Sequence, residues 1–231
     1  MRLTNMTRLA LAAALLALTA SVPSHAFAQN SVPPGQGNKF KDTSPVKPPA
    51  GARVAIYEFE DLECPACSHA FPIVHAAVAK YNIPLVRHDF PLPMHIWSRN
   101  AAVIARYLQD KASPKDAEDY RRDVFANQNS IATKDDLENF SRKWFQQHGK
   151  SMPFVLDPGG QLAAEVQADY ALGERIGLSQ TPTIFVVTPK GWTQIMDISL
   201  LYQTIDAALA ANPAAASAPQ NRLKKSPTTR N

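Results

Sequence analysis

The sequence is poor in cysteine: its 231 residues contain only two, Cys64 and Cys67, in the stretch "CPAC". It therefore lacks the several pairs from which a disulfide framework is built. A bond between these two would close a ring of only four residues. Loop-closure entropy gives such a ring little stabilising power compared with the roughly 3 kcal/mol expected of a loop of about 15 residues. The pair is therefore better explained by redox chemistry or metal binding than by structural support.

The sequence also lacks a strong net charge. Its formal charge is +4, and without residues 1–28 it retains 22 basic residues against 20 acidic ones, a charge of +2. Several of these bases lie in the last ten residues, "RLKKSPTTRN", where they are typical of a solubilising tail. The folded part is thus nearly neutral, and we expect no nucleic acid as a partner.

Long apolar runs are missing beyond the N-terminus, so no later segment is predicted to cross a bilayer. Residues 1–28 contain two arginines, the apolar run "LALAAALLALTA" and the small residues Ala26 and Ala28. This pattern predicts a signal peptide that is cleaved after Ala28, with an uncleaved anchor as the alternative. We expect the mature protein to be exported, most simply to a bacterial periplasm.

Strand-like and helix-like patterns alternate along the rest of the chain. The run at 53–59 is too apolar for a half-exposed strand and predicts a central one, followed by a helix and a second strand at 84–90. This order implies a right-handed parallel crossover. The pattern from about 96 to 177 is helical, and two strands and a helix follow it.

These elements predict an α/β fold over residues 52–211, in the order β-α-β … β-β-α, with an all-helical insertion at about 96–177. Residues 29–51 are rich in Pro, Gly and polar side chains and predict a flexible leader. Residues 212–231 predict a disordered tail.

The cysteine pair follows the first predicted strand, where the next helix should begin. Cys64 would lie at the N-cap with Pro65 at the first helical position. Unpaired backbone N–H groups and the helix dipole favour a thiolate there. Cys67 lies nearly one turn on and should be more buried. We therefore predict that Cys64 is the exposed, attacking sulfur and that Cys67 resolves the mixed disulfide.

Metal binding is the alternative for this pair. Structural zinc requires four ligands, and the sequence has no second cysteine pair to complete a site. His69 lies two residues after Cys67 and would point elsewhere on a helix, while His75, His88 and His95 are the other histidines near by. We expect no metal and no cofactor.

A Thr-Pro pair, Thr181 and Pro182, directly precedes a predicted strand. Proline cannot donate to a strand ladder, so its place here is unusual. A cis bond would explain it, although only about 5–6% of X–Pro bonds in folded proteins are cis. The residues themselves leave the isomer open.

Taken together, "CPAC" after an apolar strand, Pro72 in the same helix and "TPT" opening a late strand resemble the thioredoxin fold. The helical insertion, the signal peptide and "EFEDLECPAC" resemble its DsbA-type branch of exported thiol–disulfide oxidoreductases. The resemblance covers about residues 52–211.

The resemblance implies that the Thr181–Pro182 bond is cis and lies against Cys64 and Cys67. The backbone of Thr181 would then pair with an incoming peptide as an added strand. It also implies that Pro72 kinks the active-site helix.

Glu58, six residues before Cys64, matches a buried acid of DsbA-type proteins. It shares a strand face with Val54 and Ile56, so burial should raise its pKa. It could then relay a proton to or from Cys67. The alternative is a glutamate at a strand end that is turned to solvent.

The sequence departs from the family in two ways. DsbA-type oxidases often have histidine at the second position between the cysteines, where this chain has Ala66. Glu60, Asp61 and Glu63 also add negative charge ahead of Cys64, which disfavours a thiolate. We therefore expect a milder oxidant than the strongest members of the family.

The predicted function is disulfide exchange with exported protein or peptide thiols, in the oxidase direction, with a membrane redox partner for re-oxidation. An isomerase or reductase that is held reduced is the alternative. Related isomerases carry a separate N-terminal dimerisation domain, for which residues 29–50 are too few, so we expect a monomer. A hypothesis from another class is a peptide-binding or chaperone module without turnover.

Overall fold

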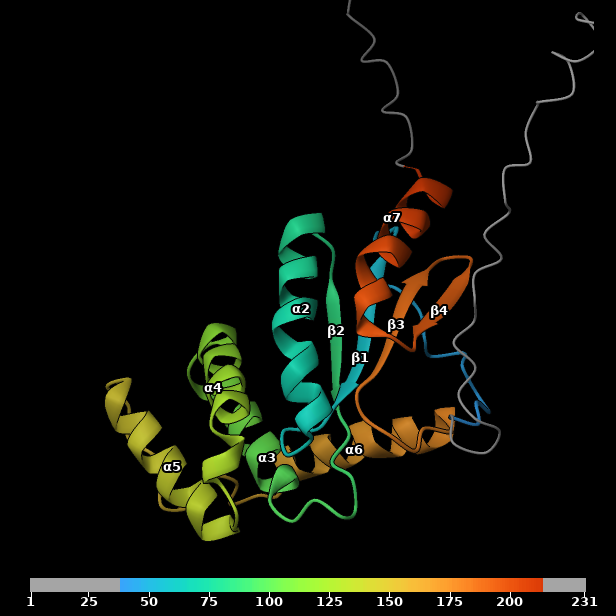
Figure 1. Ribbon diagram of the computed structural model, residues 1–231. Helices are drawn as coiled ribbons and strands as arrows, with labels where there is room; N and C mark the ends of the chain where they lie inside the picture. Colours follow the sequence, from blue (N-terminus) through green and yellow to red (C-terminus); the bar gives the residue numbers. More distant parts are fainter. Residues whose placement is uncertain (1–37, 214–231) are drawn as a thin grey trace, which may run out of the picture. The chain divides into compact units, whose positions relative to one another are not determined.

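The computed structural model describes residues 38–213 (Figure 1). The predicted signal peptide, the first part of the predicted leader and residues 214–231 of the predicted tail lie outside this range. Within the described range, no helix combines the length and the apolar character that a membrane span requires.

A four-stranded sheet forms the centre of the fold, in the order β2-β1-β3-β4. Its strands are β1 (Ala55–Glu60), β2 (Leu85–Asp89), β3 (Thr183–Thr188) and β4 (Gly191–Ile195). β1 is parallel to β2, as predicted, and antiparallel to β3. All six residues of β1 are buried, because strands flank it on both sides and helices cover both faces.

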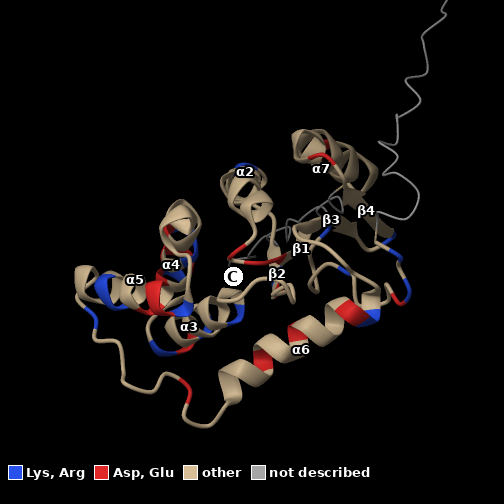
Figure 2. Cartoon of the chain, turned by 60° about the horizontal axis from the view of Figure 1, so that its bottom comes forward, with Lys and Arg blue, Asp and Glu red and all other residues tan. Residues whose placement is uncertain are grey.

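Helices lie on both faces of the sheet. α2 (Pro65–Tyr81) and α7 (Leu201–Ala211) cover one face, and α6 (Gln161–Ile176) covers the other (Figure 2). Alternate residues of β1 pack against the helices on the two faces, because successive side chains of a strand point to opposite faces. Ile56 packs in the cluster that includes residues of α2 and α7, and Phe59 packs in the cluster that includes residues of α6.

The segment between β2 and β3 is helical, which confirms the predicted insertion. It contains α3 (Ser98–Lys111), α4 (Pro114–Ala126), α5 (Lys134–Gln147) and α6, with a short 3-10 turn at Gln128–Ser130; a second such turn, Ile198–Leu200, precedes α7. Its amphipathic helices bury their aromatic residues against the start of α2, in one cluster with both cysteines. The insertion therefore forms one wall around the cysteine pair.

The second half of the predicted leader, residues 38–51, is packed against the domain. Val46 is 3% exposed. Asn38 accepts a hydrogen bond from the backbone N–H of Ser179 at 3.0 Å and donates one to the hydroxyl of Thr183, also at 3.0 Å. The prediction of a flexible leader is therefore wrong for this half, because tertiary hydrogen bonds fix a segment whose composition alone favours disorder.

Candidate redox site

Cys64 and Cys67 lie where α2 begins. Cys64 is the N-cap, with extended backbone angles (φ −79°, ψ 120°), and Pro65 occupies the first turn together with Ala66, as predicted. Both cysteines are free thiols, 6% and 2% exposed respectively. The prediction of an exposed Cys64 is therefore wrong, because the chain around Thr181 packs against it.

The Thr181–Pro182 segment lies against Cys64, as the resemblance implied. The Thr181–Pro182 bond is cis. The thiol of Cys64 donates to the backbone oxygen of Thr181 at 3.3 Å, between residues that are 117 positions apart in the chain. The Thr181 hydroxyl is buried and has no hydrogen-bond partner among residues 38–213. It is thus available to a thiolate at Cys64.

The surroundings of Cys64 favour its thiolate. Its pKa is lowered from 9.0 to about 6, first of all by a hydrogen bond from Cys67. Burial opposes this shift, while Thr181 and the backbone N–H groups of Cys67 and Ala66 add to it. The predicted contribution of the helix start is therefore present, but the neighbouring thiol contributes more. At neutral pH the Cys64 sulfur is mainly ionised.

The surroundings of Cys67 have the opposite effect. Burial, followed by the neighbouring Cys64 sulfur, raises the pKa of Cys67 well above 9.0. The backbone N–H of Asp61 lies 3.4 Å from the Cys67 sulfur and opposes the shift, and the charge of Glu60 adds to it. The site thus holds one thiolate and one thiol, three residues apart.

Glu58 lies inside the protein, so its prediction as a buried acid is confirmed against the solvent-exposed alternative. It is 2% exposed, and burial, followed by the charge of Glu60, raises its pKa to about 8. However, the acid among the main influences on the pKa of Cys67 is Glu60. Because Glu60 follows Glu58 by two residues on the same face of β1, strand alternation could have indicated it.

The other two acids ahead of Cys64 have backbone partners. The Asp61 carboxylate accepts a hydrogen bond from Leu92 N at 2.6 Å, and the Glu63 carboxylate accepts one from Trp97 N at 2.7 Å. The largest influences on the pKa of Cys64 are hydrogen bonds and burial rather than these charges. Asp61 and Glu63 therefore anchor the segment between β2 and α3 beside the cysteine pair.

A buried charge cluster, which the sequence did not predict, lies next to the site. It consists of Glu60, Arg87, Asp89, Arg106 and Arg121. Arg121 donates to Glu60 at 2.6 Å and to Asp89 at 2.8 Å, and Arg106 donates to Asp89 at 2.7 Å. Figure 2 shows acidic positions on β1, enclosed by the helices. No local pattern signals the cluster, because its members come from β1, β2, α3 and α4.

Most of the histidines that were alternative metal ligands have other partners. Three of them form close contacts with charged side chains: His75 with Arg87, His88 with Asp169 and His95 with Asp61. Within residues 38–213, no three His, Cys, Asp or Glu side chains are grouped as metal ligands would be. The contact of His95 places an imidazole beside Asp61, which the sequence did not predict.

Comparison with known proteins identifies the family. The family model described as Thioredoxin matches residues 46–196, so the chain belongs to the thioredoxin family. No curated protein matches the chain.

Solved structures that match include two from Wolbachia pipientis. α-DsbA1 is 15% identical, with a TM-score of 0.57 over 72% of this chain and 90% of that chain. The thiol–disulfide exchange protein α-DsbA2 is 13% identical, with a TM-score of 0.56 over 70% and 84%. Pseudomonas aeruginosa DsbA2 is 20% identical, with a TM-score of 0.52 over 70% and 91%. At these identities the likeness shows the fold, which is that of DsbA-type proteins.

The family, the fold and the geometry of the cysteine pair together define the class of this protein. It is a thiol–disulfide oxidoreductase with a Cys64-Pro65-Ala66-Cys67 site.

Proposed function

We propose that this protein is an oxidase, which transfers the disulfide between Cys64 and Cys67 to thiol pairs of exported proteins or peptides. The observation that carries the proposal is the lowering of the Cys64 pKa to about 6 beside a thiol whose pKa is raised. A stabilised thiolate favours the reduced form, and a disulfide whose reduced form is stabilised is a stronger oxidant. This favours the oxidase direction over an isomerase or reductase.

The reaction proceeds through a mixed disulfide. A client thiolate attacks the Cys64 sulfur, the bond between Cys64 and Cys67 breaks, and Cys67 leaves with the electron pair and takes up a proton. A second client thiolate then attacks the client sulfur of the mixed disulfide, and Cys64 leaves as a thiolate. The client loses two electrons and the cysteine pair gains them.

We assign roles in these steps to Glu58 and to the backbone of Thr181. Glu58 is buried and has a pKa of about 8, so it is able to exchange a proton with Cys67 near neutral pH. The backbone of Thr181, next to Pro182, faces Cys64 and pairs with the client chain as an added strand.

The location and the re-oxidation partner are part of the same proposal. The signal-peptide pattern of residues 1–28 supports export to the periplasm. One of the similar solved structures is described as a periplasmic thioredoxin-like protein from Salmonella enterica serovar Typhimurium, at 18% identity. The reduced pair must pass its two electrons on, and we propose a membrane redox partner as the acceptor for a monomeric enzyme.

Thiol trapping in cells, combined with oxidative refolding of a reduced client in vitro, tests the proposal. We expect the Cys64–Cys67 pair to be mainly oxidised in cells and the purified disulfide form to oxidise the client. A mainly reduced pair would favour the isomerase or reductase. Replacing both cysteines by Ser should abolish activity, whereas a binding or chaperone module would keep its function.

A further inference from the structure

Asp61 joins the sulfur of Cys67 to the segment between β2 and α3. Its backbone N–H donates to the Cys67 sulfur at 3.4 Å. Its side chain is fully buried and accepts three hydrogen bonds, from Glu63 N at 2.8 Å, from Leu92 N at 2.6 Å and from His95 Nδ1 at 2.7 Å. The position of the donor to Cys67 therefore depends on how firmly this carboxylate is held.

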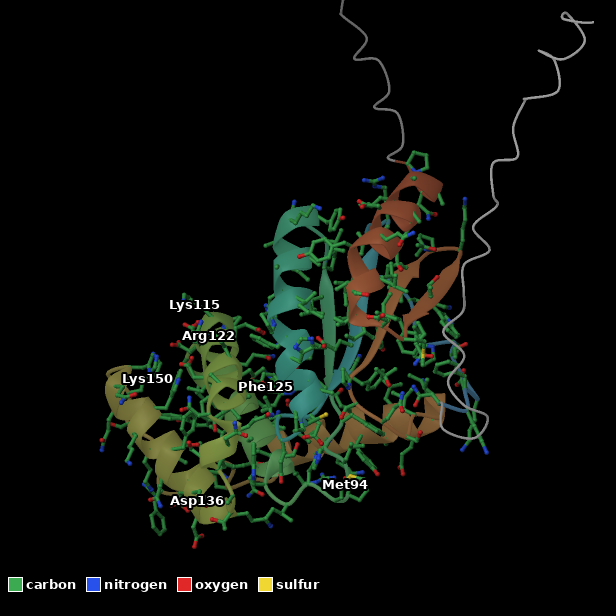
Figure 3. All side chains as sticks on the ribbon, in the orientation of Figure 1. Met94, Lys115, Arg122, Phe125, Asp136 and Lys150 are labelled. Atoms are coloured by element: carbon green, nitrogen blue, oxygen red, sulfur yellow. The ribbon has the colours of Figure 1, made fainter. Side chains whose placement is uncertain are left out.

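His95 provides the only one of these three bonds that comes from a side chain. Its own backbone N–H bonds to Leu92 O at 3.0 Å, so a tight turn fixes the residue. Met94 and Ile96 on either side are 69% and 56% exposed, while the His95 side chain is only 19% exposed and turns inward to Asp61. Figure 3 shows Met94 in this segment, near the end of the domain at which α2 begins.

We propose that His95 is a positioning residue that, through Asp61, holds a backbone N–H on the leaving sulfur of Cys67. The inference rests on the proposed function and adds a residue to it. When a client thiolate attacks Cys64, the disulfide bond breaks and Cys67 takes the electron pair. A hydrogen bond to a sulfur strengthens as negative charge develops on it, so the N–H of Asp61 favours this step.

Two reactions of the full mature chain separate this role from a general effect on the fold. In the first, glutathione reduces the disulfide form, and Cys67 is the leaving group. In the second, iodoacetamide alkylates Cys64 of the reduced form, and Cys67 does not leave. We expect His95→Phe to slow the first reaction by about three- to tenfold, because the hydrogen bond to the Cys67 sulfur is weakened but not removed, and to leave the second unchanged.

Two variants provide the controls. His95→Asn keeps a side-chain N–H near the position of Nδ1 and should restore the rate of reduction. His88→Phe removes a matched pair, because His88 Nδ1 also lies 2.7 Å from an aspartate, Asp169, and its side chain is 16% exposed against 19% for His95. We expect His88→Phe to leave the rate of reduction unchanged. If His95→Phe does not fold, His95→Ala takes its place.

The proposal is overturned if the His95 variant is reduced at the wild-type rate. It is also overturned if both reactions slow equally, or if His88→Phe slows reduction as much as His95→Phe does. Glutathione needs no client protein, so these outcomes are independent of whether the wild-type enzyme oxidises clients in refolding assays. A wild-type protein that fails in refolding but is reduced normally by glutathione contradicts the proposed function alone.

Discussion

The redox site and the buried charge cluster lie side by side at the end of β1, but they stabilise charge by different means. At the redox site, a hydrogen bond from Cys67 and the side chain of Thr181 favour a single thiolate on Cys64. In the cluster, full charges are paired directly, as in the 2.6 Å contact between Arg121 and Glu60. The polar groups at the redox site lower the pKa of Cys64, whereas the ion pairs of the cluster join helices of the insertion to the sheet.

The redox site therefore determines reactivity, whereas the charge cluster contributes mainly to stability. Breaking a buried ion pair leaves an uncompensated charge, whereas changing one hydrogen bond to a sulfur alters reactivity by a smaller free energy. Glu58 precedes Glu60 on β1, and the charges of Glu60 and Arg87 both act on its pKa. Changes in the cluster should therefore affect unfolding most, and changes at the site should affect titration and rates.

The largest effect is expected from Arg121→Met. The substitution leaves Glu60 and Asp89 without a shared buried partner, and we expect the free energy of unfolding to fall by about 3–5 kcal/mol. Urea unfolding of the reduced protein measures this. Arg122→Met is the matched control, because this adjacent side chain is 54% exposed and its ion pairs should contribute only about 0.2–1 kcal/mol. Equal losses in the two variants would contradict the comparison.

A smaller effect, dependent on pH, is expected from Glu58→Gln. Burial raises the pKa of Glu58 from 4.5 to about 8 in the folded protein. Between these values the folded state keeps a proton that the unfolded chain has released, so stability falls as the pH rises. Glutamine cannot ionise, so the stability of the variant relative to the wild type should increase from pH 5 to pH 8. Urea unfolding at several pH values tests this, and a constant difference would argue against a buried, protonated Glu58.

The redox potential should change its dependence on pH near pH 6. The pKa of Cys64 is about 6 and that of Cys67 is well above 9.0, so the reduced pair holds two protons below pH 6 and one above it. For a two-electron couple we expect the potential to fall by about 60 mV per pH unit below the break and by about 30 mV above it. Equilibration with glutathione across the pH range measures both slopes. A single slope through neutral pH would place the Cys64 pKa elsewhere.

The smallest effect is expected from Thr181→Val. It removes the buried hydroxyl that helps to lower the pKa of Cys64, so that pKa should rise. We expect alkylation of Cys64 at pH 6 to slow by about two- to tenfold, because the thiolate loses one available hydrogen-bond donor. Thr181→Ser keeps the hydroxyl and serves as the control. If both variants react at the wild-type rate, the hydroxyl does not contribute to the thiolate.

Much of the fold could be predicted from the sequence because its signals are local. The apolar run of β1 predicted a central strand, and Cys64 with Pro65 predicted the start of a helix. Thr133 and Asp136 form a capping box at the start of α5, a signal that spans only four residues of the sequence. The cis bond before Pro182 was implied by the family resemblance rather than by the residues themselves.

The tertiary contacts could not be predicted in this way. The contact of Asn38 with Ser179 spans 141 residues, and that of Arg121 with Glu60 spans 61. The composition around Asn38 indicated a flexible segment, and the pattern around Arg121 indicated only that the segment is helical. The acids ahead of Cys64 were expected to repel its thiolate, but backbone N–H groups of a distant segment bind two of them.

The sequence by itself determined the order of strands and helices, the place of the cysteine pair at a helix start and hence the redox chemistry of the protein. Periodicity, capping and proline placement act over a few residues, so they can be read along the chain. Only the tertiary structure decided how deeply Cys64 is buried, which groups set the pKa values of the two thiols and that His95 meets Asp61. These properties depend on distances and on exclusion of water, which arise when remote segments pack together.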